Sequence, residues 1–115
     1  MKRGEIWWAS LDDSTGSGPG YKRPTVVISS NDFNLSKINT VIVAIITSNL
    51  NLSEAPGNFE LAKKNSGLSK KSVVNISQLI TLDKSFLTEK MGKLTNKQIE
   101  ILNDGLKLVL SLYKI

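Results

Sequence analysis

Residues 39–48 read NTVIVAIITS and contain six consecutive apolar residues, Val41 to Ile46. Such a run, rich in β-branched residues and without alternation, is typical of a strand that is buried on both faces. We therefore expect a central strand here, with the remaining strands arranged on either side of it.

Shorter strand patterns lie before and after this run. We expect strands at residues 4–11 (GEIWWASL), 25–30 (TVVISS), 58–61 and 87–94, and one or two more within 72–82. A chain with many short strands commonly resolves its edges as a barrel. The sequence thus predicts a small, strongly curved, mostly antiparallel sheet.

The C-terminal region alone has a clear helical pattern. Thr95 and Gln98 fit a capping box, in which each side chain binds a backbone N–H at the start of the helix. Two apolar stripes follow at helical spacing, one made by Ile99, Leu102, Leu106, Val109 and Leu110, and a second by Ile101, Leu108 and Leu112. Core packing explains both stripes, and a dimer contact explains the wide apolar arc equally well.

Length and composition indicate one soluble domain spanning residues 1–115. We expect no membrane segment, since no apolar run approaches about 18 residues, and the first residues lack the apolar stretch of a signal peptide. The chain has no cysteine, which excludes a disulfide framework and suits a reducing cytoplasm. It also has no histidine, so we expect neither a metal site nor a cofactor, and any enzyme chemistry must proceed without the commonest general base.

The charge balance favours a polyanionic partner. The net charge is +5, and the basic pairs Lys63-Lys64 and Lys70-Lys71 flank the segment around residues 65–69, while Lys22-Arg23 ends a glycine-rich loop. Basic patches raise affinity for nucleic acid by releasing condensed counterions. A lysine-rich surface that only keeps the protein soluble explains the same charge.

Two adjacent tryptophans lie in the first expected strand. Alternation places Trp7 and Trp8 on opposite faces, so one is expected to pack in the core and the other to meet a surface groove or a partner.

Arg23 is one of only two arginines in the chain and is a candidate for binding an anion. It lies where the loop from Asp12 runs into a strand, in DDSTGSGPGYKRPTVVISS. A guanidinium offers a planar fork of donors for a phosphate or a carboxylate. The alternative is a solvated arginine or one paired with Asp12 or Asp13.

Several segments in order resemble the MazF/PemK family of toxin endoribonucleases. They are KRGEIWWASL, the glycine loop ending in YKRPTVVISSNDFN, the central strand ending in IITSN, SGLSKKSVVNISQLITLDKSFL, and the closing helix. The resemblance covers essentially the whole chain. It implies a mainly β fold with a C-terminal helix, a small SH3-like barrel of the MazF/PemK/CcdB group. It also implies a homodimer, a cytoplasmic toxin of a toxin–antitoxin pair, metal-independent cleavage of single-stranded RNA, and a MazE-like antitoxin as partner.

The resemblance assigns candidate site residues by position. Arg23 and Thr47 match the two residues that the family uses for chemistry. The positions that match RNA-contacting neighbours in relatives are Lys22, Ser48, Asn49 and Gln78, with Asn31 as a weaker candidate. Taken alone, Thr47 fits a strand-ending residue bonded to nearby backbone, and Gln78 fits an outward residue of an alternating strand.

A groove that reads bases needs an aromatic surface for stacking. Tyr21 is the first candidate and Trp7 the second, in a groove that we expect Lys22, Asn49 and residues 50–56 to line as well.

RNA supplies its own nucleophile, the 2′-OH, so a protein need only align it and stabilise the phosphorane charge. Arginine is effectively never deprotonated, which makes Arg23 an electrostatic clamp rather than an acid. Many relatives carry a glutamate five residues before the arginine, and this chain has Gly18 there. Either that glutamate is dispensable, or Asp12 or Asp13 replaces it, or the nuclease is slow.

Two other functions remain open at this stage. CcdB-type toxins of the same fold group bind DNA gyrase and do not cut RNA, but they lack the paired arginine and threonine. A barrel that binds RNA or an antitoxin without catalysis is the second alternative, and Gly18 gives it weight.

Overall fold

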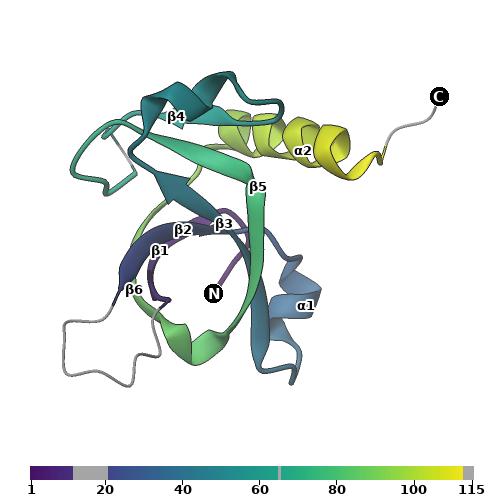
Figure 1. Cartoon of the computed structure of the whole chain (residues 1–115). Coiled ribbons are helices and arrows are strands. Elements are labelled where there is room, and N and C mark those ends of the chain that lie inside the picture. Colours follow the sequence, from purple (N-terminus) through teal and green to yellow (C-terminus); the bar gives the residue numbers. More distant parts are fainter. Residues whose placement is uncertain (12–20, 65, 113–115) are drawn as a thin grey trace.

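Six antiparallel strands form one curled sheet in the computed structural model, which describes residues 1–11, 21–64 and 66–112. The strands are β1 (Glu5–Ser10), β2 (Lys22–Val27), β3 (Thr40–Thr47), β4 (Phe59–Leu61), β5 (Ser72–Asp83) and β6 (Leu87–Lys93). Their order across the sheet is β4-β5-β3-β2-β1-β6, and the curl brings the outer strands toward one another (Figure 1). The predicted mainly β fold with a C-terminal helix is confirmed.

The central position of β3 is also confirmed. Ala44 and Ile46 face one apolar cluster, which includes Leu102 of the C-terminal helix, while Val41 and Val43 face a second cluster. All four side chains are fully buried. The apolar run lacks alternation because both faces of this strand lie against a core.

Strand β5 is continuous but irregular. Ile45 pairs with Asn75, whereas the preceding residue Ala44 pairs with Leu79, so residues 76–78 form a bulge. Within the bulge, the side-chain oxygen of Asn75 accepts hydrogen bonds from the backbone N–H and the hydroxyl of Ser77, at 3.2 and 2.6 Å. Bulges bend a strand and increase its twist. The two strands allowed for within residues 72–82 are therefore one bent strand, which helps to curl the sheet.

The strand expected at residues 25–30 begins earlier and ends earlier than predicted. It spans Lys22–Val27, and Ser30 instead caps a short helix, α1 (Asn31–Leu35), by accepting a hydrogen bond from the N–H of Phe33. Serine competes well for a cap position because its hydroxyl satisfies an exposed helix donor. The earlier start places Arg23 inside the strand rather than at the end of the loop.

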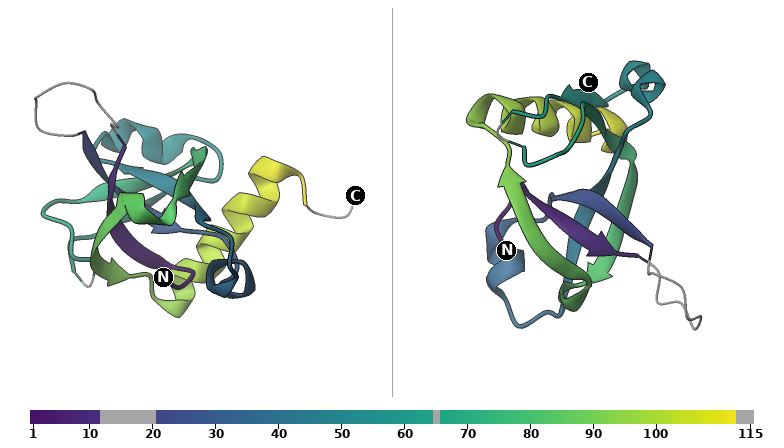
Figure 2. Two further views of the ribbon diagram at one scale, coloured as in Figure 1. Left: turned by 90° about the horizontal axis from the view of Figure 1, so that it is seen from below. Right: turned by 90° about the vertical axis from the view of Figure 1, so that its left-hand side faces the viewer.

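Helix α2 (Asn96–Leu110) lies across one end of the sheet beside β4 (Figures 1 and 2). Its capping box between Thr95 and Gln98 is present as predicted. Gly105 is buried against Gly57, where a Cβ on Gly105 would lie 2.5 Å from the carbonyl oxygen of Gly57. Short 3-10 helices η1 (Leu50–Glu54) and η2 (Lys84–Phe86) connect strands.

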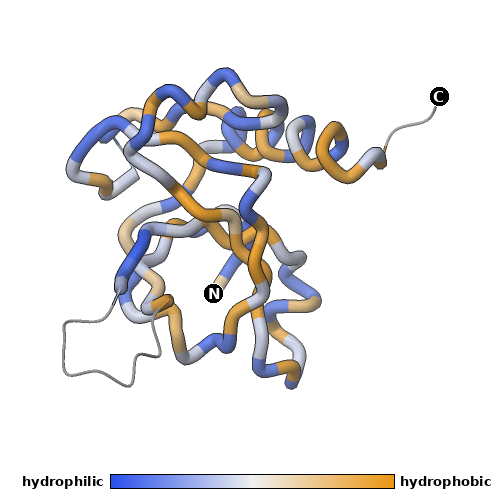
Figure 3. The backbone as a smooth tube through the Cα atoms, viewed as in Figure 1, coloured by the Kyte–Doolittle hydropathy of each residue, from blue (hydrophilic) through white to orange (hydrophobic). Residues whose placement is uncertain are grey.

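Only part of the apolar surface of α2 packs inside this chain. Leu102 is fully buried, and Ile99 and Leu106 pack against the same cluster. Apolar residues continue to the C-terminal end of the helix (Figure 3). The large exposed ones are Ile101 nearer its middle, Leu108, Val109 and Leu110 in its last turn, and Leu112 just after it. Within the described residues, no helix is long and apolar enough to cross a bilayer.

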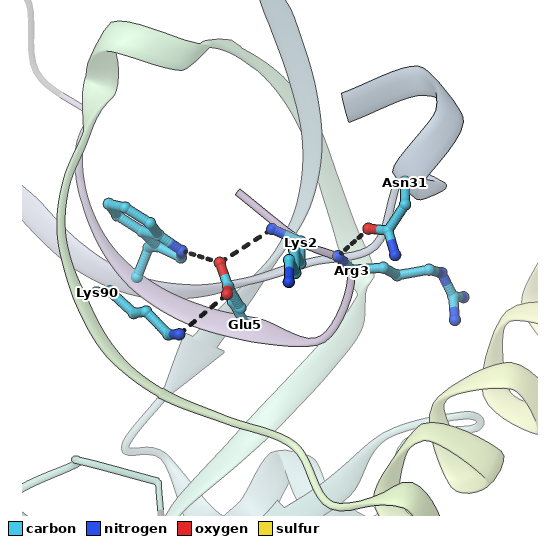
Figure 4. Close-up of polar contacts among 6 residues, drawn as sticks. Lys2, Arg3, Glu5, Asn31 and Lys90 are labelled. Carbon is cyan, nitrogen blue, oxygen red and sulfur yellow. Dashed lines mark hydrogen bonds and ion pairs between the residues drawn. The ribbon is translucent and has the colours of Figure 1, made fainter. Parts of the chain in front are cut away.

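The start of β1 is held by a polar cluster around Glu5 (Figure 4). Its carboxylate accepts hydrogen bonds from the backbone N–H of Lys2 at 2.9 Å and the Trp7 indole at 3.1 Å, and it pairs with the Lys90 ammonium at 3.0 Å. Burial alone would raise the pKa of Glu5, but these donors and the charge of Lys90 together lower it below its ordinary value. Glu5 is therefore held as a paired carboxylate that fastens β1 to β6.

Candidate functional site

A pocket of about 360 Å³ opens where the ends of β2 and β3 approach the connection between β4 and β5. Its lining residues are Trp8, Arg23, Pro24, Ile46, Thr47, Ser48, Leu68, Ser69, Lys70, Ser72 and Met91. The structure thus brings together Arg23 and Thr47, the two residues predicted to carry the chemistry.

The backbone register accounts for this meeting. The pairing of β2 with β3 ends at Thr25 and Ile45, so Arg23 and Thr47, each two residues beyond that pair, lie at the same end of the two strands. Both side chains line the pocket there, together with their strand neighbours Pro24 and Ile46.

Arg23 is fixed by two neutral acceptors. Its Nη2 donates to the backbone carbonyl of Ile46 at 3.2 Å, and its Nη1 donates to the Tyr21 hydroxyl. The guanidinium also lies over the Tyr21 ring, with 5.8 Å from its central carbon to the ring centroid. The two ion pairs within the described residues do not involve Arg23, and the alternative partners Asp12 and Asp13 lie outside those residues. A guanidinium held by carbonyl and hydroxyl oxygens keeps its positive charge available to an anion.

Thr47 is half-buried, and its Oγ1 accepts a hydrogen bond from the N–H of Asn49 at 3.1 Å. The expected bond between a strand-ending threonine and nearby backbone is therefore present. This bond uses the hydroxyl oxygen as acceptor and leaves its proton to be donated. The side chain is thus oriented by the backbone with a donor left for a bound group.

The other predicted contact residues divide into two groups. Ser48 lines the pocket, Tyr21 contacts Arg23, and Asn49 follows Ser48 and caps η1 by accepting from the N–H of Asn51 at 3.1 Å. Lys22 is exposed beside Arg23 but is not among the residues that line the pocket.

Asn31 and Gln78 lie elsewhere. Asn31 begins α1 beyond the far end of β2, and its side-chain oxygen accepts from the N–H of Arg3 at 2.7 Å (Figure 4). Gln78 lies in the bulge of β5, where its side-chain oxygen accepts from Asn75 at 3.1 Å. Neither residue lines the pocket that holds Arg23 and Thr47. Their contact with RNA stays a prediction.

The tryptophan that lines the pocket is Trp8, whereas Trp7 was the one expected in the groove. Trp7 packs against the second apolar cluster and donates to Glu5, whereas Trp8 lines the pocket. The prediction that one packs and the other meets a groove is confirmed. Trp7 is half-buried and lies outside the pocket lining, so its stacking on RNA stays a prediction.

The groove wall expected at residues 50–56 also differs in the structure. That segment contains η1, and the lining residues include none of it. The rest of the lining is instead supplied by Leu68, Ser69, Lys70 and Ser72, together with Met91 of β6. Apart from the basic pair Lys70-Lys71, no sequence pattern identified this wall.

Comparison with known proteins gives a consistent result. Residues 2–110 match the family described as PemK-like, MazF-like toxin of type II toxin–antitoxin system. The chain is 40% identical over 112 residues to Endoribonuclease MazF6 of Mycobacterium tuberculosis, covering 97% of this chain and 98% of that protein. It is 37% identical over 115 residues to Endoribonuclease MazF of Staphylococcus saprophyticus, covering 100% of this chain and 95% of that protein.

Solved structures share the fold. The Mycobacterium tuberculosis toxin MazF-mt6 superposes with a TM-score of 0.79 at 22% identity, covering 96% of this chain and 99% of the other. A mycobacterial endoribonuclease in complex with its cognate antitoxin gives a TM-score of 0.76 at 20% identity, covering 100% and 99% of the two chains.

Proposed function

Because the chain belongs to the PemK-like, MazF-like endoribonuclease toxins, we propose that it cleaves single-stranded RNA through Arg23 and Thr47, without a metal ion. The observation that carries the proposal is the shared pocket of these two residues, in which Arg23 is held by a carbonyl and a hydroxyl oxygen. A rigid cation beside an oriented hydroxyl donor suits an anionic group that gains charge during the reaction.

The reaction follows from the chemistry of RNA. The 2′-oxygen forms a bond to the adjacent phosphorus while the bond from phosphorus to the 5′-oxygen breaks, leaving a 2′,3′-cyclic phosphate. The proton of the 2′-OH passes to water, and water protonates the departing 5′-oxygen. Arg23 donates to the non-bridging oxygens, and Thr47 donates one more hydrogen bond there or orients the 2′-OH. DNA lacks the attacking group and is not cut.

None of the described residues that line the pocket is a carboxylate that could act as base toward the 2′-OH. Gly18, which occupies the position of the family's glutamate, and the alternatives Asp12 and Asp13 all fall outside the described residues. Alignment and charge stabilisation by Arg23 and Thr47 supply catalysis without a dedicated base, at a reduced rate.

We further propose a MazE-like antitoxin as cytoplasmic partner, occupying the groove that takes RNA. Supporting structures of relatives are a mycobacterial endoribonuclease with its cognate antitoxin and MazE-MazF from Deinococcus radiodurans. A gyrase-binding role of the CcdB type is not favoured, since the curated relatives are named endoribonucleases.

We also propose a homodimer in which the exposed apolar residues of α2 meet a second copy. Leu108, Leu110 and Leu112 are 50, 49 and 65% exposed. Large apolar side chains exposed close together commonly mark a surface that binds another protein chain. Light scattering of the wild type is expected to give twice the mass of one chain. The double variant Leu108→Glu, Leu112→Glu should give the mass of one chain, whereas the control Lys107→Glu should still give the mass of two. A wild-type protein that stays monomeric at micromolar concentrations would contradict the dimer.

Incubation of the purified protein with a long single-stranded RNA in EDTA tests the nuclease proposal. The wild type should cut at discrete sites, mapping of the ends should show cyclic or 3′-phosphates, and Arg23→Ala should leave the RNA intact. Intact RNA with a folded, antitoxin-free wild-type protein would favour a barrel that binds without catalysis.

A further inference from the structure

The pocket carries positive charge from two segments of the chain. Arg23 comes from β2, and Lys70 comes from the connection between β4 and β5, and both line the pocket. Among the lining residues there is no carboxylate to neutralise either side chain. A pocket with separated cations and no acid is suited to a ligand that carries more than one negative charge.

Lys70 differs from its neighbour Lys71. The ammonium of Lys71 pairs with Glu60 of β4 at 3.1 Å, along the pair of strands at the edge of the sheet. Neither ion pair within the described residues involves Lys70, which lines the pocket. The two lysines thus have the same charge and adjacent positions but different surroundings.

The wall that bears Lys70 is fixed to the rest of the barrel. Leu68 is buried in the first apolar cluster, and the hydroxyl of Ser72 donates to the carbonyl of Lys70 at 3.0 Å. Gly67 has a positive φ of +77° and lies so close to the backbone of Met91 that a Cβ would collide with it. These contacts hold the backbone at Lys70 in place at the edge of the pocket.

The volume indicates what the two cations hold. About 360 Å³ falls within the range of about 300–1,000 Å³ that holds small organic ligands, and it exceeds what one phosphate group requires. In an RNA strand, each nucleotide has a phosphate on either side. A nucleotide in the pocket would therefore present one phosphate to each of the two cations.

We propose that Lys70 binds the phosphate that flanks the scissile one, on the other side of the nucleotide held in the pocket. This proposal rests on the proposed nuclease function. Arg23 then holds the scissile phosphate, and Lys70 holds the strand without contacting the reacting atoms. Lysine suits this task because a compact ammonium binds a phosphate as a point charge without requiring a fixed angle.

The test compares Lys70→Ala with Lys71→Ala, which removes the same charge one residue away. A short RNA containing one mapped cut site gives kcat and KM, and the same strand with a deoxyribose at that site gives the dissociation constant without cleavage. Lys70→Ala should raise KM and the dissociation constant about tenfold, with kcat within about twofold of wild type. The slope of log affinity against log salt should fall by about 0.7. Lys71→Ala should change each quantity less than about twofold, and Lys70→Arg should restore binding.

A second test replaces the flanking phosphate of the RNA by a neutral methylphosphonate and measures the dissociation constant. The methylphosphonate should weaken binding to the wild type as much as Lys70→Ala does, and should cause no further loss in the Lys70→Ala protein. Additive losses would overturn the proposal, and so would equal effects of Lys70→Ala and Lys71→Ala or a loss confined to kcat. Circular dichroism melting checks that the variants are folded. A wild-type protein that binds the deoxy strand but cuts no RNA would refute the nuclease proposal while still testing Lys70.

Discussion

Arg23 donates from Nη2 to the backbone carbonyl of Ile46, the residue that immediately precedes Thr47. The guanidinium of β2 is therefore positioned by the same stretch of β3 that presents the threonine. Since backbone atoms in paired strands move little relative to one another, the distance between the two proposed catalytic side chains is set by the sheet itself.

Replacing Arg23 tests this arrangement. Arg23→Ala should lower the cleavage rate roughly 10²–10³-fold, by analogy with the loss of one oxyanion donor. Arg23→Lys keeps the charge but loses the fork that bridges Ile46 and the substrate, so its rate should also fall by more than about tenfold. Initial rates on one RNA give the comparison, and thermal melting should show an unchanged fold. An unchanged rate for Arg23→Ala would rule out the assignment.

Thr47 allows a near-isosteric comparison. Thr47→Val removes the hydroxyl and leaves the shape, so the rate should fall about 10- to 100-fold. Thr47→Ser keeps the oxygen that accepts from Asn49 and keeps the proton, and should retain most of the activity. Single-turnover rates measure both variants. Equal activity of the valine and serine variants would show that the hydroxyl has no part in the reaction.

The two tryptophans allow a spectroscopic test, since the chain has no others. Binding of an RNA blocked by 2′-O-methyl groups should quench the fluorescence of Trp8, which lines the pocket, and leave Trp7 unaffected. The quench should therefore persist in Trp7→Phe and vanish in Trp8→Phe. The reverse pattern would mean that RNA binds on the opposite face of β1.

The parts of the molecule that were predictable are those with local signals. The apolar run in β3 and the capping box of α2 depend on neighbouring residues only, and both are present. Family motifs likewise pointed to Arg23 and Thr47 because each belongs to a contiguous segment, and both residues line one pocket, although their roles stay proposals. The resemblance itself is confirmed by the match over residues 2–110. Alternation predicted that Trp7 and Trp8 oppose one another.

What could not be predicted depends on contacts between distant segments. Which tryptophan faces the pocket is decided by the direction in which the sheet curls, and alternation carries no information about that. The wall around Lys70 exists because Gly67 lies against Met91 of β6, some way along the chain. Asn31 and Gln78 were assigned by motif position alone, and neither is among the residues that line the pocket.

The contact between Gly105 and Gly57 gives a prediction whose sign opposes helix propensity. In an exposed helix, Gly→Ala is stabilising by about 0.8–1 kcal/mol. Here the added Cβ would lie 2.5 Å from the carbonyl oxygen of Gly57, a backbone atom. Gly105→Ala should therefore reduce the free energy of unfolding by about 1–3 kcal/mol. Urea unfolding measures it, with the exposed Lys107→Ala as a control that changes stability by less than about 0.5 kcal/mol. A stabilised Gly105→Ala would show that α2 does not pack so closely.

The cluster around Glu5 predicts how stability depends on pH. Because the folded protein lowers the pKa of Glu5, its carboxylate stabilises the fold above the ordinary pKa of a glutamate, about 4.3. That contribution is lost as the pH falls through the lower, folded value. Glu5→Gln keeps the shape and an acceptor but removes the charge that faces Lys90. It should lower the free energy of unfolding at pH 7 by about 1–3 kcal/mol.

The difference between wild type and Glu5→Gln should shrink steadily below about pH 4. Urea titrations from pH 7 down to pH 3 follow it, with Glu89→Gln on β6 as an exposed control that should follow the wild type throughout. A difference that stayed constant over the whole range would mean that the charge of Glu5 is not what fastens β1 to β6. The shape of the glutamine side chain would then account for the loss.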